Sequence, residues 1–480
     1  MKMKTLSAMI AASIAITACG SSGGNNNAAV ASSSSASNNS AKIVVSDVRK
    51  VLETNADIAL AAYSDSVDTA VMLQTALATF KAEPTQANLD AAKLAWLVAR
   101  EPYGQTEVYR FRLSPIDSTN YQDEDGPEGD INAWPLGEGL IDYVSNGTDF
   151  GPDQVGVTEH TTGVDYPNKT IINSTDIEIN AALISNTATA PDEHDVIAGY
   201  HAIEFLLWGQ DLNIDNSADT EDSREMSTGG NILNSGGHRP LEDFTTNDFA
   251  DRRHTYLEVV AAKLVADLTS VRDGWADGAA YREAFTNVSD AATAKRKLTE
   301  ILVGMGTLSE GELAGERIQI AFRGNSQEDE HSCFSDNTHR DILLNAEGVS
   351  NSYYGEYAGY DSDLDGIDDV TTRAVVGYGI DDYLEDVSLN DLANSMEAAL
   401  SATWTNVEAV DASARAGSPV DVLIMDNNNR DNVLAQSILS LSAQANVIAQ
   451  VAVALDIDED VVDPDASACD TSDPIAECEE

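Results

Sequence analysis

The chain has 480 residues, of which 81 are Asp or Glu and 27 are Lys or Arg, so its formal net charge is −54. A surface this anionic repels phosphate backbones and anionic headgroups, which excludes nucleic acid as a partner and membrane docking through basic patches. With 42% hydrophobic residues the composition is still globular, and the low aromatic content of 6% favours helices.

The N-terminus predicts a bacterial lipoprotein signal. Two lysines precede a short apolar stretch at residues 8–18, which ends in the sequence Ile-Thr-Ala-Cys. We expect residues 1–18 to be removed and Cys19 to be acylated, which would anchor the mature chain to a membrane without a transmembrane helix. The alternative is an ordinary signal peptide that contains a cysteine. Gly20 stands where an inner-membrane retention signal has Asp, so the expected location is the cell envelope, on the periplasmic side of the outer membrane.

Residues 19–45 are rich in Ser and Asn and predict a flexible linker. Helical periodicity dominates the body that follows, which predicts an all-α fold. We expect two related helical bundles, at residues 46–285 and 286–456, and a frayed acidic tail at 457–480. Long polar insertions are expected at about 118–190, 211–240 and 355–385.

The sequence also predicts a helix start in the second half and hints at a repeat. Ser309 and Glu312 have the spacing of a capping box that opens a helix. A weak internal echo matches three residues of the first half with three of the second at equal spacing: Arg100, Glu107 and Phe111 with Arg323, Glu330 and Phe334.

Three cysteines remain after Cys19. Cys469 and Cys478 could close a small disulfide loop in the tail, because an envelope compartment is oxidising. Cys333 then has no partner, and no Cys-x-x-Cys metal or redox motif is present.

The chemistry concentrates at His201 and Glu204. They are three residues apart, so on a helix they share a face and could bind one ion together. Four apolar residues follow, at 205–208, which predicts a buried helix. The alternative is a hydrogen-bonded His–Glu pair inside a core, because a buried charge needs a partner or a metal.

Other candidate ligands lie in the two echo regions. In the first, Glu107 and Asp117 are the predicted further metal ligands. In the second, Glu328 with His331 and Asp336 with His339 repeat the three-residue spacing. Carboxylate and imidazole together suit iron, manganese or zinc. The alternative for each of these acids is that it is a solvated surface group and not a metal ligand. An auxiliary site is predicted from Arg100, Glu330, Asp336 and His339.

Four ordered segments together resemble the imelysin family, in the branch called iron-regulated protein A. They are Trp96-x-x-x-Arg100-x-x-Tyr103-Gly104-x-x-Glu107, Pro115-Ile116-Asp117, Gly199-x-His201-x-x-Glu204, and Ser332-Cys333-Phe334-Ser335-Asp336-Asn337-Thr338-His339. The resemblance implies two related helical bundles with the Gly-x-His-x-x-Glu motif near their interface. It also implies envelope proteins linked to iron acquisition, and some members are described as metallopeptidases. The position that echoes His201 is Ile424, so the halves are not equivalent.

A weaker motif suggests calcium. Asp361, Asp363 and Asp365, followed by Gly366, copy the opening of a calcium loop, but Thr372 stands where the bidentate Glu is expected. The alternative is a solvated acidic turn.

Two functions follow from the sequence. The first is an envelope-anchored metal-binding lipoprotein that captures iron, as an ion or a chelate, together with outer-membrane or periplasmic iron-uptake components. The alternative is a zinc-dependent metallopeptidase in which His201 and Glu204 hold the metal.

Overall fold

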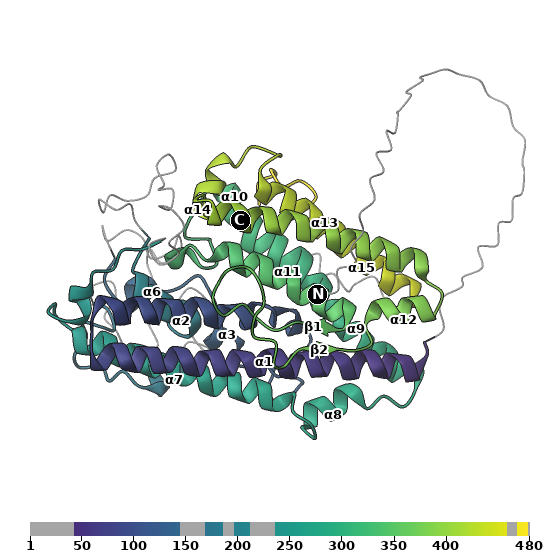
Figure 1. Ribbon diagram of the computed structural model, residues 1–480, viewed down its shortest axis with the longest axis horizontal. Helices are drawn as coiled ribbons and strands as arrows, with labels where there is room; N and C mark the ends of the chain where they lie inside the picture. The colour runs from purple at the N-terminus through teal and green to yellow at the C-terminus, as the bar shows by residue number, and fades with distance from the viewer. Residues whose placement is uncertain (1–42, 145–168, 186–195, 212–235, 458–467, 479–480) are drawn as a thin grey trace, which may run out of the picture.

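The computed structural model describes residues 43–144, 169–185, 196–211, 236–457 and 468–478 (Figure 1). Cys19, the predicted signal peptide and almost all of the predicted linker lie outside this part of the chain. The described residues form helices and one short two-stranded antiparallel sheet, so the predicted all-α class is confirmed. The duplication of two bundles stays a prediction.

The first half of the chain is built on three long helices. α1 packs along its length against α2 and α7, and Thr85 caps α2 by accepting a hydrogen bond from the Asn88 N–H. The elements of this half are α1 (Val45–Ala82), α2 (Gln86–Gly104), η1 (Glu107–Tyr109), α3 (Glu128–Ile131), α4 (Glu138–Ile141), α5 (Ala181–Ser185), α6 (Gly199–Trp208), η5 (Leu241–Phe244), α7 (Ala250–Gly274) and α8 (Ala280–Thr286).

In Figure 1, α10, α13, α14 and α15 lie above the helices of the first half, with α13 and α15 side by side and α11 below them. The other large elements of the second half, α9, α12, β1 and β2, contact α1. Its elements are α9 (Ala291–Thr307), η6 (Leu308–Gln319), α10 (Ile320–Gly324), η7 (Cys333–Ser335), α11 (Thr338–Tyr354), β1 (Glu356–Tyr357), β2 (Val375–Val376), α12 (Ile380–Asp386), α13 (Asn390–Arg415), α14 (Val420–Leu423), η8 (Ile424–Asp426) and α15 (Val433–Ala454).

Among the described residues, one helix, α15, is long and apolar enough to cross a membrane. Its length and composition are also those of a core helix, and 56% of its most apolar window is buried inside the protein. Its apolar residues, among them Leu434, Ile438 and Leu441, pack against α13 and η6. In this fold α15 therefore serves as a core helix.

The sequence predicts that a new helix begins at Ser309, but in the structure one helix continues through this residue. α9, η6 and α10 follow without a break, and η6 is a π-helix of 12 residues. The predicted capping box is wrong, because the Ser309 hydroxyl donates to the Met305 carbonyl of the same helix at 2.7 Å. π-Helical turns often occur at functional sites, and this one carries Arg317 towards the interior.

A buried network of charges joins η6 to η1. Arg317 donates to Glu107 at 2.6 Å and to Glu312 at 2.8 Å, and Arg110 donates to the same two carboxylates at 3.1 and 3.0 Å. Burial alone would raise the pKa of Glu107. The two arginines outweigh burial and lower that pKa to about 2.

The end of the chain folds back onto η6, so the prediction of a frayed tail is wrong for residues 468–478. Cys469 and Cys478 form the disulfide. The Gln319 side chain donates to the carbonyls of Asp470 and Asp473 at 3.2 and 3.1 Å. The disulfide closes a loop short enough to present these carbonyls together.

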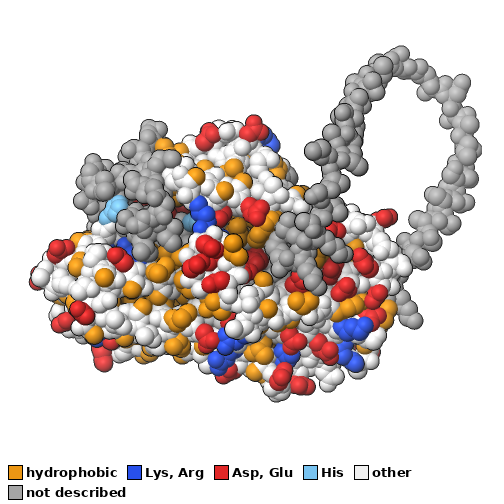
Figure 2. All heavy atoms as spheres, in the orientation of Figure 1, with side chains coloured by type: hydrophobic (Ala, Val, Ile, Leu, Met, Phe, Trp, Pro, Cys, Tyr) orange, Lys and Arg blue, Asp and Glu red, His pale blue; other side chains and the backbone are white. Residues whose placement is uncertain are grey.

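The surface shows why the net charge carries little information about a site. Figure 2 shows Asp and Glu side chains scattered over the visible face, with hydrophobic and uncharged atoms between them. The acids that bear on the site are the few that are buried.

The depressed pKa of Glu107 predicts a pH-dependent contribution to stability. A fall from 4.5 to about 2 corresponds to about 3 kcal/mol, which is present above pH 4.5 and is lost as the pH falls towards 2. We expect Glu107→Gln to lower the free energy of unfolding by about 3 kcal/mol at pH 7, with the deficit shrinking below pH 4.5. Urea denaturation at several pH values measures this.

The matched control for that experiment is Glu300→Gln. Glu300 pairs with Lys297 in a more exposed position, with side chains 21% and 15% exposed, and we expect a change of at most about 1 kcal/mol. A deficit for Glu107→Gln that stays constant down to pH 3 would contradict the assignment.

Candidate functional site

The site is built on α6, all of whose residues are buried. Gly199 begins this helix with φ +77°, and a Cβ there would lie 2.3 Å from the Ile131 carbonyl oxygen. Only glycine therefore lets α6 approach α3 this closely. Trp96 of α2 holds the first turn, because its indole N–H donates to the Tyr200 carbonyl at 2.9 Å.

His201 and Glu204 face each other. His201 Nδ1 lies 2.9 Å from Glu204 Oε2. The other carboxylate oxygen, Oε1, accepts hydrogen bonds from the backbone N–H and the hydroxyl of Ser335, at 3.0 and 2.7 Å. In this geometry Glu204 orients the imidazole from the Nδ1 side and does not share an ion with it.

His201 Nε2 is buried and has no hydrogen-bond partner among the described residues. A buried ring nitrogen without a partner is costly unless a ligand takes the place of water. Burial lowers the pKa of His201 well below its usual value, and the neighbouring His331 and Arg100 act in the same direction. The ring is therefore neutral near pH 7, as a metal ligand must be.

Burial also raises the pKa of Glu204 well above its usual range, against the opposing effect of its bonds from Ser335. Without an ion the His201–Glu204 pair is therefore neutral, with one proton between Glu204 Oε2 and His201 Nδ1 and a second proton on His201 Nε2. A cation that binds His201 would displace that proton, because metal binding and protonation compete for the same site.

A small cavity adjoins His201. It has room for about one water molecule or one ion. Glu138 and Glu330 are both buried at its wall, each 2% exposed. Its lining residues are Trp134, Pro135, Leu136, Glu138, His201, Glu328, Glu330, His331, Cys333 and Phe334.

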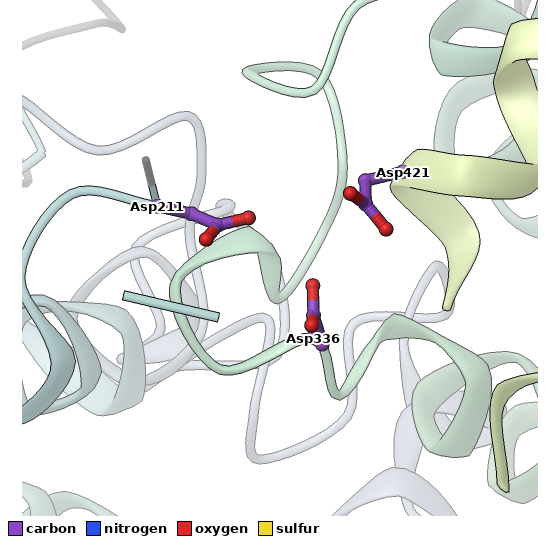
Figure 3. A group of neighbouring side chains, drawn as sticks. All are labelled: Asp211, Asp336 and Asp421. Atoms are coloured by element: carbon purple, nitrogen blue, oxygen red, sulfur yellow. The ribbon is translucent and has the colours of Figure 1, made fainter. Parts of the chain in front are cut away.

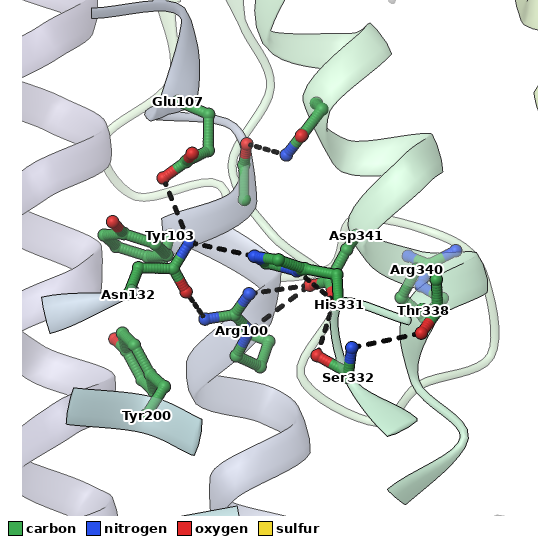
Figure 4. Close-up of polar contacts among 12 residues, drawn as sticks. Arg100, Tyr103, Glu107, Asn132, Tyr200, His331, Ser332, Thr338, Arg340 and Asp341 are labelled. Carbon is green, nitrogen blue, oxygen red and sulfur yellow. Dashed lines mark hydrogen bonds and ion pairs between the residues drawn. The ribbon is translucent and has the colours of Figure 1, made fainter. Parts of the chain in front are cut away.

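A second imidazole, that of His331, lies beside the first, with the ring centroids 4.7 Å apart. Figure 4 shows the network that holds it: His331 Nδ1 lies 2.9 Å from Asp341 Oδ2, and Arg100 donates to Asp341 Oδ1 at 2.8 Å. The Asn132 side chain lies between Arg100 and His331. Its amide oxygen accepts from Arg100 at 2.5 Å, and its amide nitrogen lies 3.3 Å from His331 Nε2.

The charges of this network fix its protonation. Burial lowers the pKa of His331 to about 4, so the ring is neutral near pH 7. Burial would raise the pKa of Asp341, but Arg100 and His331 outweigh it and hold that pKa well below its usual value. Asp341 is therefore an ionised acceptor, and His331 Nδ1 carries the proton that it accepts.

Glu107 and Asp117, the other predicted ligands, are engaged elsewhere. Glu107 forms the ion pairs described above and is linked to the site through Asn132, whose amide nitrogen lies 3.5 Å away. Asp117 Oδ2 accepts from the backbone N–H groups of Arg112 and Ser114, both at 3.1 Å, and so closes a turn.

The predicted auxiliary residues occupy three places. Arg100 belongs to the His331 network, and Glu330 lines the cavity. His339 Nδ1 lies 2.9 Å from the Asp336 carbonyl oxygen. The Asp336 side chain meets those of Asp211 and Asp421, with candidate ligand oxygens within 4.8 Å of one another (Figure 3).

The predicted calcium loop is an acidic turn organised by its own backbone. Asp361 Oδ1 accepts from the N–H groups of Asp363 and Leu364 at 3.2 and 2.7 Å, and Oδ2 accepts from Gly366 at 2.6 Å. The carboxylates of Asp361, Asp363 and Asp365 come within 4.8 Å of one another. Calcium binding here stays a prediction.

Sequence reasoning left several site residues out. His331 carried a signal, since it pairs with Glu328 at helical spacing, but it was not assigned to the metal site. Ser335 lies within a segment of the resemblance without an assigned role. Asn132 and Asp341 carry no pattern that marks them, because their roles depend on contacts with Arg100 across the fold.

The comparisons with known proteins agree on one family. The model of the imelysin family matches residues 59–448, and the chain therefore belongs to that family. Iron-regulated protein A of Synechococcus elongatus is 42% identical over 67 residues, which cover 14% of this chain and 17% of that relative. The crystal structure of an iron-regulated protein A precursor from Parabacteroides distasonis has a TM-score of 0.54 at 17% identity, over 85% of this chain and 96% of that one. This likeness shows a shared fold.

The buried Arg100 predicts a large loss of stability on its removal. We expect Arg100→Met to lower the free energy of unfolding by about 3–5 kcal/mol, because Asp341 would keep a buried charge without its cation. The control is Arg323→Met, the echo position, whose carboxylate partner Glu477 is 81% exposed, with an expected loss of about 1 kcal/mol. Equal losses in chemical denaturation would contradict this account.

Proposed function

We propose that this member of the imelysin family is an envelope-anchored protein that binds iron as its cargo, at a site centred on His201. The observation that carries the proposal is the buried His201 imidazole, held at Nδ1 by Glu204 and open at Nε2. A carboxylate on one ring nitrogen and an open second nitrogen are the usual arrangement of a histidine that binds a metal.

The surroundings of His201 fit an iron ion. Glu138 and Glu330 supply buried carboxylates on the cavity wall, and carboxylate with imidazole is a set that binds iron. Glu204 fixes the ring, and the apolar residues of α6 keep water away from it. The iron-regulated relatives support an iron-related role for the chain.

The cavity favours a bare ion over a chelate or a peptide. The space beside His201 is about that of one water molecule, which suits one ion, whereas a siderophore or a peptide occupies a larger pocket. This is the argument for capture over the zinc-dependent metallopeptidase alternative, in which a substrate carbonyl must reach the metal.

The proposed location is the bacterial cell envelope, with a lipid anchor at Cys19. This rests on the signal sequence alone. Outer-membrane or periplasmic components of iron uptake are the partners that such a location supports.

Removal of the open nitrogen tests the proposal. We expect the wild type to bind one iron ion and His201→Gln to bind it at least about 100-fold more weakly, measured by anaerobic calorimetric titration with Fe²⁺. Glu204→Gln should cost about 10–100-fold, the usual effect of removing a residue that orients a ligand. His254→Gln is the control, because His254 is buried elsewhere and bonds the Phe244 carbonyl.

Iron affinity that is equal in wild type and His201→Gln would contradict the proposal. The peptidase alternative has its own outcome: cleavage of a protein substrate by the wild type that a chelator stops and Glu204→Gln abolishes.

A further inference from the structure

We propose that His331 is the second nitrogen ligand of the site, which makes it a two-imidazole site for ferrous iron. This inference rests on the proposed function and goes beyond it, because it names a ligand outside the Gly-x-His-x-x-Glu motif and the oxidation state of the ion. The juxtaposition that carries it is two buried imidazoles at one small cavity.

The two histidines have the same geometry of support. His201 Nδ1 and His331 Nδ1 each lie 2.9 Å from a buried carboxylate oxygen, of Glu204 and Asp341 respectively. Each carboxylate is fixed in turn by a serine hydroxyl, from Ser335 at 2.7 Å and from Ser332 at 2.5 Å. Histidine ligands of metals have this carboxylate support, which sets the tautomer and orients the ring.

The support leaves Nε2 of His331 with its lone pair. His331 Nδ1 faces the Asp341 carboxylate, with Oδ2 2.9 Å away, so Nε2 is the ring nitrogen left for a ligand. The Asn132 amide points its N–H towards Nε2, because its oxygen is engaged by Arg100. That contact is long, at 3.3 Å, and it is the one bond that His331 would give up to an ion.

Both rings line the same cavity, and their centroids are 4.7 Å apart at an interplanar angle of 78°. Among the described residues, no three candidate ligand atoms at this cavity come within 4.8 Å of one another. A third ligand therefore has to move in when an ion enters. Glu330 and Glu138 stand at the same wall to supply it.

Among iron ions, the donor set favours the ferrous state. Two imidazoles with one carboxylate are the ligands of non-haem ferrous iron, whereas a harder ion prefers oxygen ligands. The space beside the two rings is about that of one water molecule, which suits a single ion. The structure therefore favours Fe²⁺ over a ferric chelate as the cargo.

The test counts imidazoles around the bound ion. The full chain is loaded with Fe²⁺ under anaerobic conditions, and X-ray absorption at the iron edge reports the number of imidazole ligands. We expect two in the wild type and one in His331→Gln. In calorimetric titration His331→Gln should bind Fe²⁺ at least about 100-fold more weakly, beyond the 10–100-fold typical of a supporting residue.

The matched control is His339→Gln. His339 lies in the same segment and near a carboxylate, Asp411, and burial likewise lowers its pKa to about 4. It is absent from the cavity wall, so its replacement should leave affinity and ligand count unchanged. Thermal unfolding of each variant shows whether it is folded, and the wild-type ligand count decides the question even where a variant is not.

The outcomes separate the two proposals. A wild-type site with one imidazole, lost in His201→Gln and retained in His331→Gln, overturns this inference and leaves the proposed function standing. Failure of the wild type to bind iron overturns both. Tight binding of a ferric chelate, with no affinity for Fe²⁺, overturns the assignment of the ion.

Discussion

The structure around the site depends on one buried ion pair, between Arg100 of α2 and Asp341 of α11. Each side chain is 1% exposed, and either charge alone would cost several kcal/mol in this interior. The pair connects the two helices, and both side chains also form hydrogen bonds to residues of the site. Arg100 holds Asn132, while Asp341 holds His331 and Ser332. The position of the second imidazole is thus set by the electrostatics of the core.

The same principle organises the rest of the interior of this very acidic chain. Basic residues are scarce, and the structure places several of them in the core opposite carboxylates: Arg317 opposite Glu107, and Arg340 opposite Glu101 at 2.7 Å. Each pair stabilises a contact between helices that are distant in sequence. The net charge of −54 therefore says little about the fold. The buried ion pairs matter more, because they connect helices in the core.

Much of the fold could be predicted from the sequence, because a 3.6-residue repeat of apolar side chains is a local property. The burial of α6 and the proximity of His201 to Glu204 follow from the same kind of pattern. Spacing does not reveal whether Glu204 faces an ion or the ring beside it, since that depends on Ser335, far along the chain. The π-helix was missed because Ser309 and Glu312 imitate a capping box, and Asn132 because a lone amide in a turn has no periodicity.

The burial of His201 has a consequence for kinetics. Because His201 Nε2 is buried, an ion reaches it only when side chains of the cavity wall, such as those of Trp134 and Phe334, move aside. The lifetime of the loaded protein is then governed by how often that wall opens, and affinity alone does not determine it. A partner that binds this wall could release the cargo quickly without competing for the metal.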